Sequence, residues 1–197
     1  RDFSTDGGLL FEDCVFEGGL SSAGARFGGT LEIRSSTMIP RRDDGDWVDM
    51  EKMSCGDLLM SDCAVRGSLD LSGLTATRLQ FSDLSFFGSM MSHFSLIEQY
   101  VSMSVMLCGG NLDFYGTVVT HNFFVLDGPF LLAGDLDARS LRVGTGVFIG
   151  STTGDNSEIK GNVNFQNAVI PSNFRLHNVD VQGEINGRYL NAGTVSI

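Results

Sequence analysis

A short apolar motif recurs about every eleven residues along nearly the whole chain. Strings such as Gly67-Ser68-Leu69-Asp70-Leu71 and Gly110-Asn111-Leu112-Asp113-Phe114 carry it. Most steps between motifs are 11 residues and two are 10, with longer steps of 13, 16 and 17. Such a repeat is typical of a solenoid, in which each unit buries its apolar residues against its neighbours. With the first apolar residue of each unit as position 0, the units begin at Leu9, Leu20, Leu31, Val48, Leu58, Leu69, Leu79, Met90, Val101, Leu112, Phe123, Leu136, Val147, Val163, Phe174 and Ile185.

Each unit places apolar or small residues at positions 0, +2, +5 and +7, as in Leu79, Phe81, Leu84 and Phe86. Alternate residues of a strand point to the same side, so these positions predict two short strands that face one interior. An amphipathic helix would instead need apolar residues at i, i+3, i+4 and i+7. Position −2 is mostly Gly and position +4 favours Asp, Asn, Gly or Ser. We expect corners with positive φ at both positions.

The sequence therefore predicts an all-β fold, a β-solenoid that spans residues 1–197 as a single domain. Two units close a four-sided coil of 22 residues, which gives about eight coils and a rod on the order of 40 Å long. A three-sided coil of one and a half units is the alternative, and it would put equivalent corners out of phase. Because the chain opens without Met and stops within a strand pattern, we expect it to be a piece of a longer protein.

Two polar insertions interrupt the repeat, at residues 40–52 and 150–158. The first contains Trp47, the only tryptophan of the chain. Insertions in solenoids map to loops at an edge, which often recognise a partner. The alternative for both is a surface loop that the fold simply tolerates.

The repeat strings resemble those of pentapeptide-repeat proteins. In segments such as Asp62-Cys63-Ala64-Val65 and Asp83-Leu84-Ser85-Phe86, a small or apolar residue precedes a larger one by two, as in that family. The resemblance covers nearly the whole chain, but the average side here is nearer five and a half residues than five. It implies a right-handed, four-sided β-helix of bacterial origin, and it implies shape more securely than partner.

Charge and cysteine content narrow the possible partners and compartment. A net charge of −11 argues against direct binding to nucleic acid or to an anionic membrane. The sequence contains no run of 18 apolar residues, so it predicts no integral membrane segment. Cys14, Cys63 and Cys108 fall at inward positions and Cys55 near a corner. We expect buried free thiols, a reducing compartment and, with the resemblance, a bacterial cytoplasm.

The sequence offers no recognisable catalytic, metal or cofactor motif. The three histidines are far apart in sequence, and no C-x-x-C spacing occurs. We therefore expect no enzyme activity, no cofactor and no bound metal. A carbohydrate-active β-helix stays open only because the fold permits it.

Two outward surfaces are candidates for binding. Between Phe87 and Leu132 the outward positions turn apolar, which is typical of an interface. This predicts a rigid protein-interaction or scaffolding rod, whose partner is another protein or a second copy of the chain. The predicted apolar contact residues are Phe94, Tyr100, Val105, Phe124 and Phe148.

The second surface is a broken ladder of carboxylates at +1 positions of alternate units, formed by Asp49, Asp70, Asp113 and Asp137. Its simplest role is solubility, since a soluble rod needs a charged surface. Pentapeptide-repeat proteins that act on type II topoisomerases present an acidic rod of duplex-like width to the DNA groove of the enzyme. The resemblance therefore implies an alternative function, an acidic DNA mimic.

Overall fold

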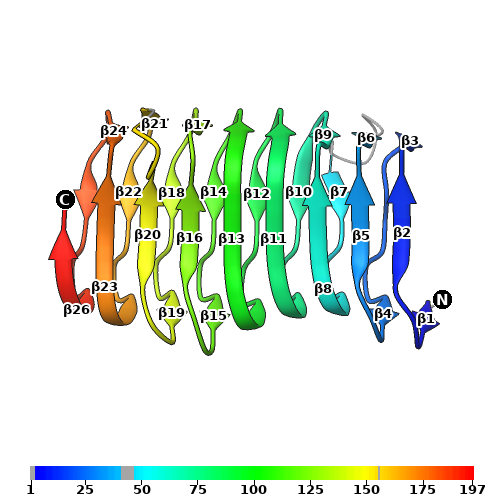
Figure 1. The fold of residues 1–197 in the computed structure, drawn as a ribbon, viewed down its shortest axis with the longest axis horizontal. Helices are drawn as coiled ribbons and strands as arrows, with labels where there is room; N and C mark the ends of the chain where they lie inside the picture. Colours follow the sequence, from blue (N-terminus) through cyan, green and yellow to red (C-terminus); the bar gives the residue numbers. More distant parts are fainter. Residues whose placement is uncertain (1–2, 41–46, 155) are drawn as a thin grey trace.

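The chain is a parallel β-solenoid of about eight turns, as its repeat predicts. The computed structural model describes residues 3–40, 47–154 and 156–197, and these form strands, turns and bends without any helix. In Figure 1 the chain ascends the near side, crosses at the top and descends the far side while it advances from the N-terminal to the C-terminal end. This is a right-handed coil, and its long axis is the axis of the rod.

Each coil has four sides, which are numbered here in chain order. Side one is formed by β1 (Ser4–Thr5), β4 (Arg26–Phe27), β15 (Val118–Val119) and β19 (Arg142–Val143). Side two is formed by β2 (Leu9–Glu12), β5 (Leu31–Arg34), β16 (Phe124–Asp127) and β20 (Val147–Gly150). Five strands run through the corner between these sides: β8 (Ser54–Ser61), β11 (Thr75–Phe86), β13 (Leu96–Cys108), β23 (Val169–His177) and β26 (Asn191–Ser196). Of these five, β11 and β13 also continue along side three.

The other two sides consist of short strands. Side three adds β3 (Val15–Gly18), β6 (Thr37–Pro40), β9 (Ala64–Val65), β17 (Leu131–Leu132), β21 (Ser157–Ile159) and β24 (Val179–Val181). Side four, a separate seven-stranded sheet, is formed by β7 (Trp47–Asp49), β10 (Ser68–Asp70), β12 (Met90–Met91), β14 (Leu112–Asp113), β18 (Leu136–Asp137), β22 (Val163–Asn164) and β25 (Ile185–Asn186). Four sides per coil exclude the three-sided alternative.

Equivalent positions of successive coils stack in register. On side two, Leu58 pairs with Leu79, which pairs with Val101. On side four, Leu69 pairs with Met90, which pairs with Leu112. These residues point inward and are fully buried, and together with the other inward positions they form one continuous core.

The corner at position +4 has the positive φ that its residue types predict. Asp13, Asp62, Asp83 and Asn178 adopt φ between 50° and 58° at the corner after side two. At the corner after side four, the left-handed residues are Gly24, Lys52, Gly73, Phe94, Gly116, Ser140, Asn167 and Tyr189. Asp and Asn tolerate this conformation better than other residues with a Cβ, which explains the composition of the first corner.

The expectation of positive φ at the −2 glycines is wrong for most of them. Gly67, Gly88, Gly110 and Gly134 form one column, and none of these has positive φ. A Cβ atom on Gly110 would lie 2.9 Å from the carbonyl carbon of Gly88, and one on Gly134 would lie 2.7 Å from that of Gly110. Glycine is required here because successive coils approach too closely for a side chain.

A ladder of polar side chains runs beside this glycine column. The Ser68 hydroxyl accepts a hydrogen bond from the Ser89 N–H at 3.0 Å, and the Ser89 hydroxyl accepts one from Asn111 N–H at 2.9 Å. The Asn111 side chain does the same for Asp135, and the column continues through Asn162 to Glu184. These bonds satisfy amides at a corner where regular strand pairing is interrupted.

The two insertions lie at different corners. Residues 41–46 and the Trp47 side chain are outside the described part of the chain, so the recognition role predicted for Trp47 stays a prediction. The second insertion follows β20 and leads into β21. There the Asp127 carboxylate accepts hydrogen bonds from the Thr152 N–H and hydroxyl at 3.2 and 3.3 Å.

Candidate interaction surfaces

The four carboxylates of the predicted ladder stand in one column on the outer face of side four. Asp49 pairs in register with Asp70, and Asp113 pairs with Asp137, while Met91 lies between these two pairs. Each carboxylate accepts a hydrogen bond from the backbone N–H two residues ahead, at 2.8 to 3.0 Å. Asn164 and Asn186 continue the column with the same bond. Asp and Asn therefore hold the turn after the strand at these positions, and this contact does not depend on charge.

Two of these carboxylates also contact a basic side chain. Asp137 Oδ2 lies 2.6 Å from the Arg139 guanidinium, and this carboxylate raises the pKa of Arg139. Asp113 Oδ2 lies 2.7 Å from His93 Nε2, in a direction that makes no hydrogen bond, so the contact is an ion pair only when the imidazole is protonated. Of the four ladder carboxylates, Asp49 and Asp70 make no such close contact, although, after Glu51 as the main cause, both help to raise the pKa of Lys52. The column therefore presents less free negative charge than its sequence suggests.

An aromatic cluster covers the corner after side four. Phe94 has φ 52°, although a bulky side chain disfavours this conformation, and 67% of its surface is exposed. Its ring lies 5.2 Å from that of Tyr115 and covers Gly116, where a Cβ atom would lie 2.7 Å from Phe94 Cδ1. The Arg139 guanidinium stacks over Tyr115 at 5.3 Å. The corner imposes this conformation in every coil, and Tyr189 combines it with the same exposure in the last coil.

The structure does not bring the five predicted apolar residues together. Phe94 lies at the corner after side four, whereas Tyr100 and Phe148 lie on side two. The side chain of Val105 is outside the described part of the chain. The outward position expected for Phe124 is wrong, because Phe124 pairs with Val101 and Val147 and is fully buried.

Phe123 is the outward residue of this phenylalanine pair, with 48% of its surface exposed. The residue after it, Phe124, packs edge-to-face on Phe114 at 4.7 Å inside the core. Because Phe124 and not Phe123 is the inward residue, the corner after side two shifts by one residue. The residue with positive φ at this corner is Gly128, with φ 95°, and not Asp127, which the sequence pattern predicts. The sequence Asp127-Gly128 could have indicated this shift by one residue, because Gly favours positive φ more strongly than Asp.

Side two carries a shallow hollow between two aromatic residues. It has a volume of about 480 Å³ and is lined by Gln80, Tyr100, Val101, Ser102, Asn122, Phe123 and Val125. The Tyr100 hydroxyl donates a hydrogen bond to Gln80 Oε1 at 3.1 Å across one edge. Beside it, the Arg78 guanidinium makes two bonds to the Asp57 carboxylate.

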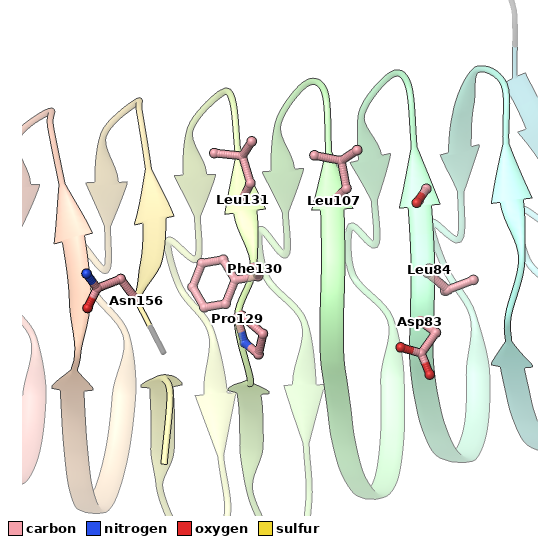
Figure 2. A pocket seen from close by; sticks show the side chains of 8 residues that line it. Asp83, Leu84, Leu107, Pro129, Phe130, Leu131 and Asn156 are labelled. Carbon is pink, nitrogen blue, oxygen red and sulfur yellow. The ribbon is translucent and has the colours of Figure 1, made fainter. Parts of the chain in front are cut away.

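A second hollow of about 470 Å³ lies at the corner between sides two and three (Figure 2). Leu107 and Leu131 border it on neighbouring strands, and Pro129 and Phe130 line its floor, with Asp83 and Asn156 on opposite sides in Figure 2. Phe87, on the same side of the rod, is 66% exposed.

The exposed apolar side chains of these surfaces all lie in the middle of the rod. Away from the two end coils, all large hydrophobic residues described as exposed fall between residues 87 and 123. They are Phe87, Phe94, Leu96, Leu107 and Phe123, and we call them the central girdle. They point from sides one, two and three and from the corner after side four, so apolar surface surrounds much of the middle of the rod.

Three of the four cysteines are in positions that suit packing, whereas His121 and His177 are exposed. All four thiols are free, and Cys55, Cys63 and Cys108 are buried. Cys55 points inward, between Phe27 and Ala76, and not to a corner as expected. Burial raises the pKa of Cys55 to about 12 and that of Cys108 to about 11. Among the described residues, no three His, Cys, Asp or Glu side chains gather as a metal site requires.

Asp62 and Asp83 are two acidic residues that line the same depression. It has a volume of about 430 Å³ and is also bordered by Ser35, Thr37 and Ser85. Both are left-handed corner residues, so the backbone conformation already accounts for their residue type.

Set against known proteins, the chain matches no family model, no curated protein and no solved structure. No helix in residues 3–40, 47–154 and 156–197 has the length and apolar character to cross a membrane. The function therefore has to be inferred from the surfaces described above.

Proposed function

We propose that this chain is a rigid, non-catalytic rod that binds another protein chain through its central girdle. The observation that carries this proposal is the grouping of Phe87, Phe94, Leu96, Leu107 and Phe123 in the middle of the rod. Exposed apolar side chains normally scatter over a surface, and their grouping is typical of an interface. Aromatic and Arg side chains dominate binding energies, and Phe94, Tyr115 and Arg139 supply that chemistry at one corner.

The architecture supports a scaffolding role because the rod presents these side chains on a stiff backbone. Inward columns, the glycine column and the Ser/Asn ladder fix each coil against the next. A pre-ordered surface loses little conformational entropy on binding. The raised pKa values of the buried thiols, which keep them protonated, support a structural role for the cysteines in a reducing compartment such as a bacterial cytoplasm.

We further propose that the chain is a relaxed relative of the pentapeptide-repeat proteins. The four-sided parallel coil and the left-handed Asp and Asn corners support this reading. DNA mimicry is favoured less, because the ladder carboxylates already hold backbone turns and Asp137 is paired with Arg139.

The test compares girdle variants with a matched control. Phe94→Ser and Phe123→Ser remove girdle residues, and Leu10→Ser removes an equally exposed apolar residue from the N-terminal coil. Partners captured by the wild type are identified and purified, and their affinity for each variant is then measured by calorimetry. We expect at least about tenfold weaker binding for one girdle variant and unchanged binding for Leu10→Ser. A set of partners that bind all variants equally would overturn the proposal.

A further inference from the structure

The two hollows at the corner after side two join into a single groove, which we call the corner groove. The depression of about 430 Å³ and the hollow of about 470 Å³ share the lining residues Asp83 and Ser85. The lining reaches from Ser35, next to β5, to Asn156, next to β21. The coils of β5, β8, β11, β13, β16 and β20 stack in this order. At about 4.8 Å per step the groove is about 24 Å long, the length of about seven extended residues.

The corner groove changes from polar to apolar along the rod. Its N-terminal half is lined mainly by hydroxyl groups and carboxylates, those of Ser35, Thr37, Asp62, Asp83 and Ser85. Its C-terminal half is lined mainly by apolar side chains, those of Leu107, Pro129, Phe130 and Leu131, and ends at Asn156 (Figure 2). Leu107, a girdle residue, is 42% exposed and pairs in register with Leu131. The groove therefore offers two chemically different halves to one bound chain.

The polar half carries two carboxylates without counterions. Asp62 and Asp83 are exposed and occupy the same corner position in successive coils. Among the described residues, neither carboxylate has a hydrogen-bond or ion-pair partner, and no Lys, Arg or His lines the groove. The backbone requires only the left-handed conformation here, and Asn178 adopts a similar φ at this corner. The fold does not need the negative charge, which is available to a ligand.

We propose that the corner groove binds an extended peptide segment of a partner protein, with a Lys or Arg side chain over Asp62 and Asp83 and an apolar side chain over Leu107 and Leu131. This choice of ligand rests on the proposed function. A cation gains both carboxylates without displacing a counterion, so charge complementarity selects a basic residue.

The spacing of the two contacts suits an extended chain. The contacts lie about two coils apart, which is about 10 Å. Side chains two or four residues apart on an extended chain point the same way and lie about 7 or 14 Å apart. The long and flexible side chain of Lys or Arg covers the difference.

Two other classes of ligand fit the groove less well. A nucleic acid would bring its phosphates against Asp62 and Asp83. An oligosaccharide would find no exposed aromatic face, because Phe130 is the single aromatic side chain among the described lining residues and is 3% exposed. An extended peptide carries a cation and an apolar side chain on one chain, as the two halves of the groove require.

Selection from a random peptide library displayed on phage, with the full chain as bait, tests this inference. We expect the enriched peptides to share a Lys or Arg two or four positions from a Leu, Ile, Val or Phe. Synthetic copies that carry a fluorophore then give dissociation constants by anisotropy. Asp83→Asn and Leu107→Ser should each raise the dissociation constant at least about threefold, and added salt should weaken binding.

Asp13→Asn is the matched control. Asp13 has φ 54° at the same corner in the first coil, outside the groove, so this variant removes the same charge from the same backbone conformation. It should leave the dissociation constant unchanged. Because Asn178 shows that Asn fits this corner, Asp83→Asn should keep the thermal midpoint of the wild type. A library that enriches no peptide, enriched peptides without a basic residue, or an equal loss with Asp13→Asn would overturn the inference.

The purified partners of the girdle comparison separate this inference from the proposed function. Weaker binding by Phe94→Ser or Phe123→Ser, together with unchanged binding by Asp83→Asn, would keep the proposed function and overturn the corner groove as a contact. Weaker binding by Asp83→Asn alone would keep the groove and overturn the girdle.

Discussion

At the scale of single residues, the ladder carboxylates illustrate how backbone needs determine residue type. Asp70 Oδ1 accepts the Ser72 N–H at 2.8 Å, and Asn164 makes the same contact with Gln166 further along the column. The side-chain oxygen is therefore what the position requires, and a negative charge is optional. This explains why Asn replaces Asp at the C-terminal end of a surface that first suggests an acidic stripe.

Replacing Asp70 separates these two properties. Asp70→Asn keeps the acceptor oxygen, so we expect the free energy of unfolding to change by less than about 0.5 kcal/mol. Asp70→Ala leaves the Ser72 N–H without this partner and should cost about 1 kcal/mol. Chemical denaturation of both variants measures the difference. Equal losses for Asn and Ala would show that charge, and not the turn, selects Asp at this position.

The buried thiols predict a dependence of stability on alkaline pH. In the folded chain the pKa of Cys55 is about 12, whereas the unfolded thiol titrates near its ordinary 9.0. Above pH 9 the unfolded state therefore binds fewer protons than the folded state, and the free energy of unfolding falls as pH rises toward 12. Cys108, with a pKa of about 11, adds a contribution of the same sign.

Urea titrations at pH 8 and pH 10.5 measure this effect. The wild type should lose more stability between these two pH values than a Cys55→Ala variant does. Equal losses in the two proteins would mean that other groups cause the alkaline transition.

At the scale of elements, contact between successive coils decides what each corner tolerates. The column through Gly88, Gly110 and Gly134 allows the backbones to approach, and the Ser89 and Asn111 side chains next to it satisfy the exposed amides. The corner after side four is less restrictive, since it accepts residues as different as Gly73 and Phe94. Bulky side chains therefore occur at that corner and are excluded from the glycine column.

The glycine column predicts a sharp difference between two Gly→Ala substitutions. A Cβ atom on Gly110 would lie 2.9 Å from the Gly88 carbonyl carbon, so Gly110→Ala should destabilise the fold by about 2 kcal/mol or more. Gly187→Ala is the control, because its Cβ atom would meet only the Leu190 side chain at 3.7 Å. Thermal and chemical denaturation of both variants measure the difference. A Gly110→Ala variant as stable as the control would contradict the close-approach explanation.

At the scale of the whole molecule, the rod is nearly one-dimensional, because each coil pairs only with the coil before it and the coil after it. The inward residues of the first coil, including Leu9, Phe11 and Leu20, are only partly buried. Those of a middle coil, such as Leu79 and Phe81, are fully buried. Stability should therefore be highest in the middle of the rod, where the girdle also lies.

Hydrogen exchange measures this gradient directly. We expect the amides of β11 and β13 to exchange most slowly, and those of β1, β2 and β26 to exchange fastest. Uniform protection from end to end would show that the chain unfolds as one cooperative unit.

The repeat alone determined the fold class and the column to which most residues belong, whereas the choice between four and three sides per coil came from the structure. Alternation along a strand is a local property, so Leu79, Asp70 and Asp83 reveal their direction without any tertiary information. The same rule failed at Phe123-Phe124, where either residue fits the pattern and pairing with Val101 and Val147 decides between them.

Only the tertiary structure decided which outward residues lie together and what the polar columns do. Phe94 and Tyr100 are six residues apart in the chain but face different directions, because side one, with Leu96 and Ile97, lies between them. The contacts between Gly88 and Gly110, or between Arg139 and Tyr115, join residues one coil apart. Such contacts depend on the exact number of residues in each coil, which the insertions and the longer steps of the repeat vary. Local pattern therefore specifies the direction of each side chain, and the stacking of coils specifies its neighbours.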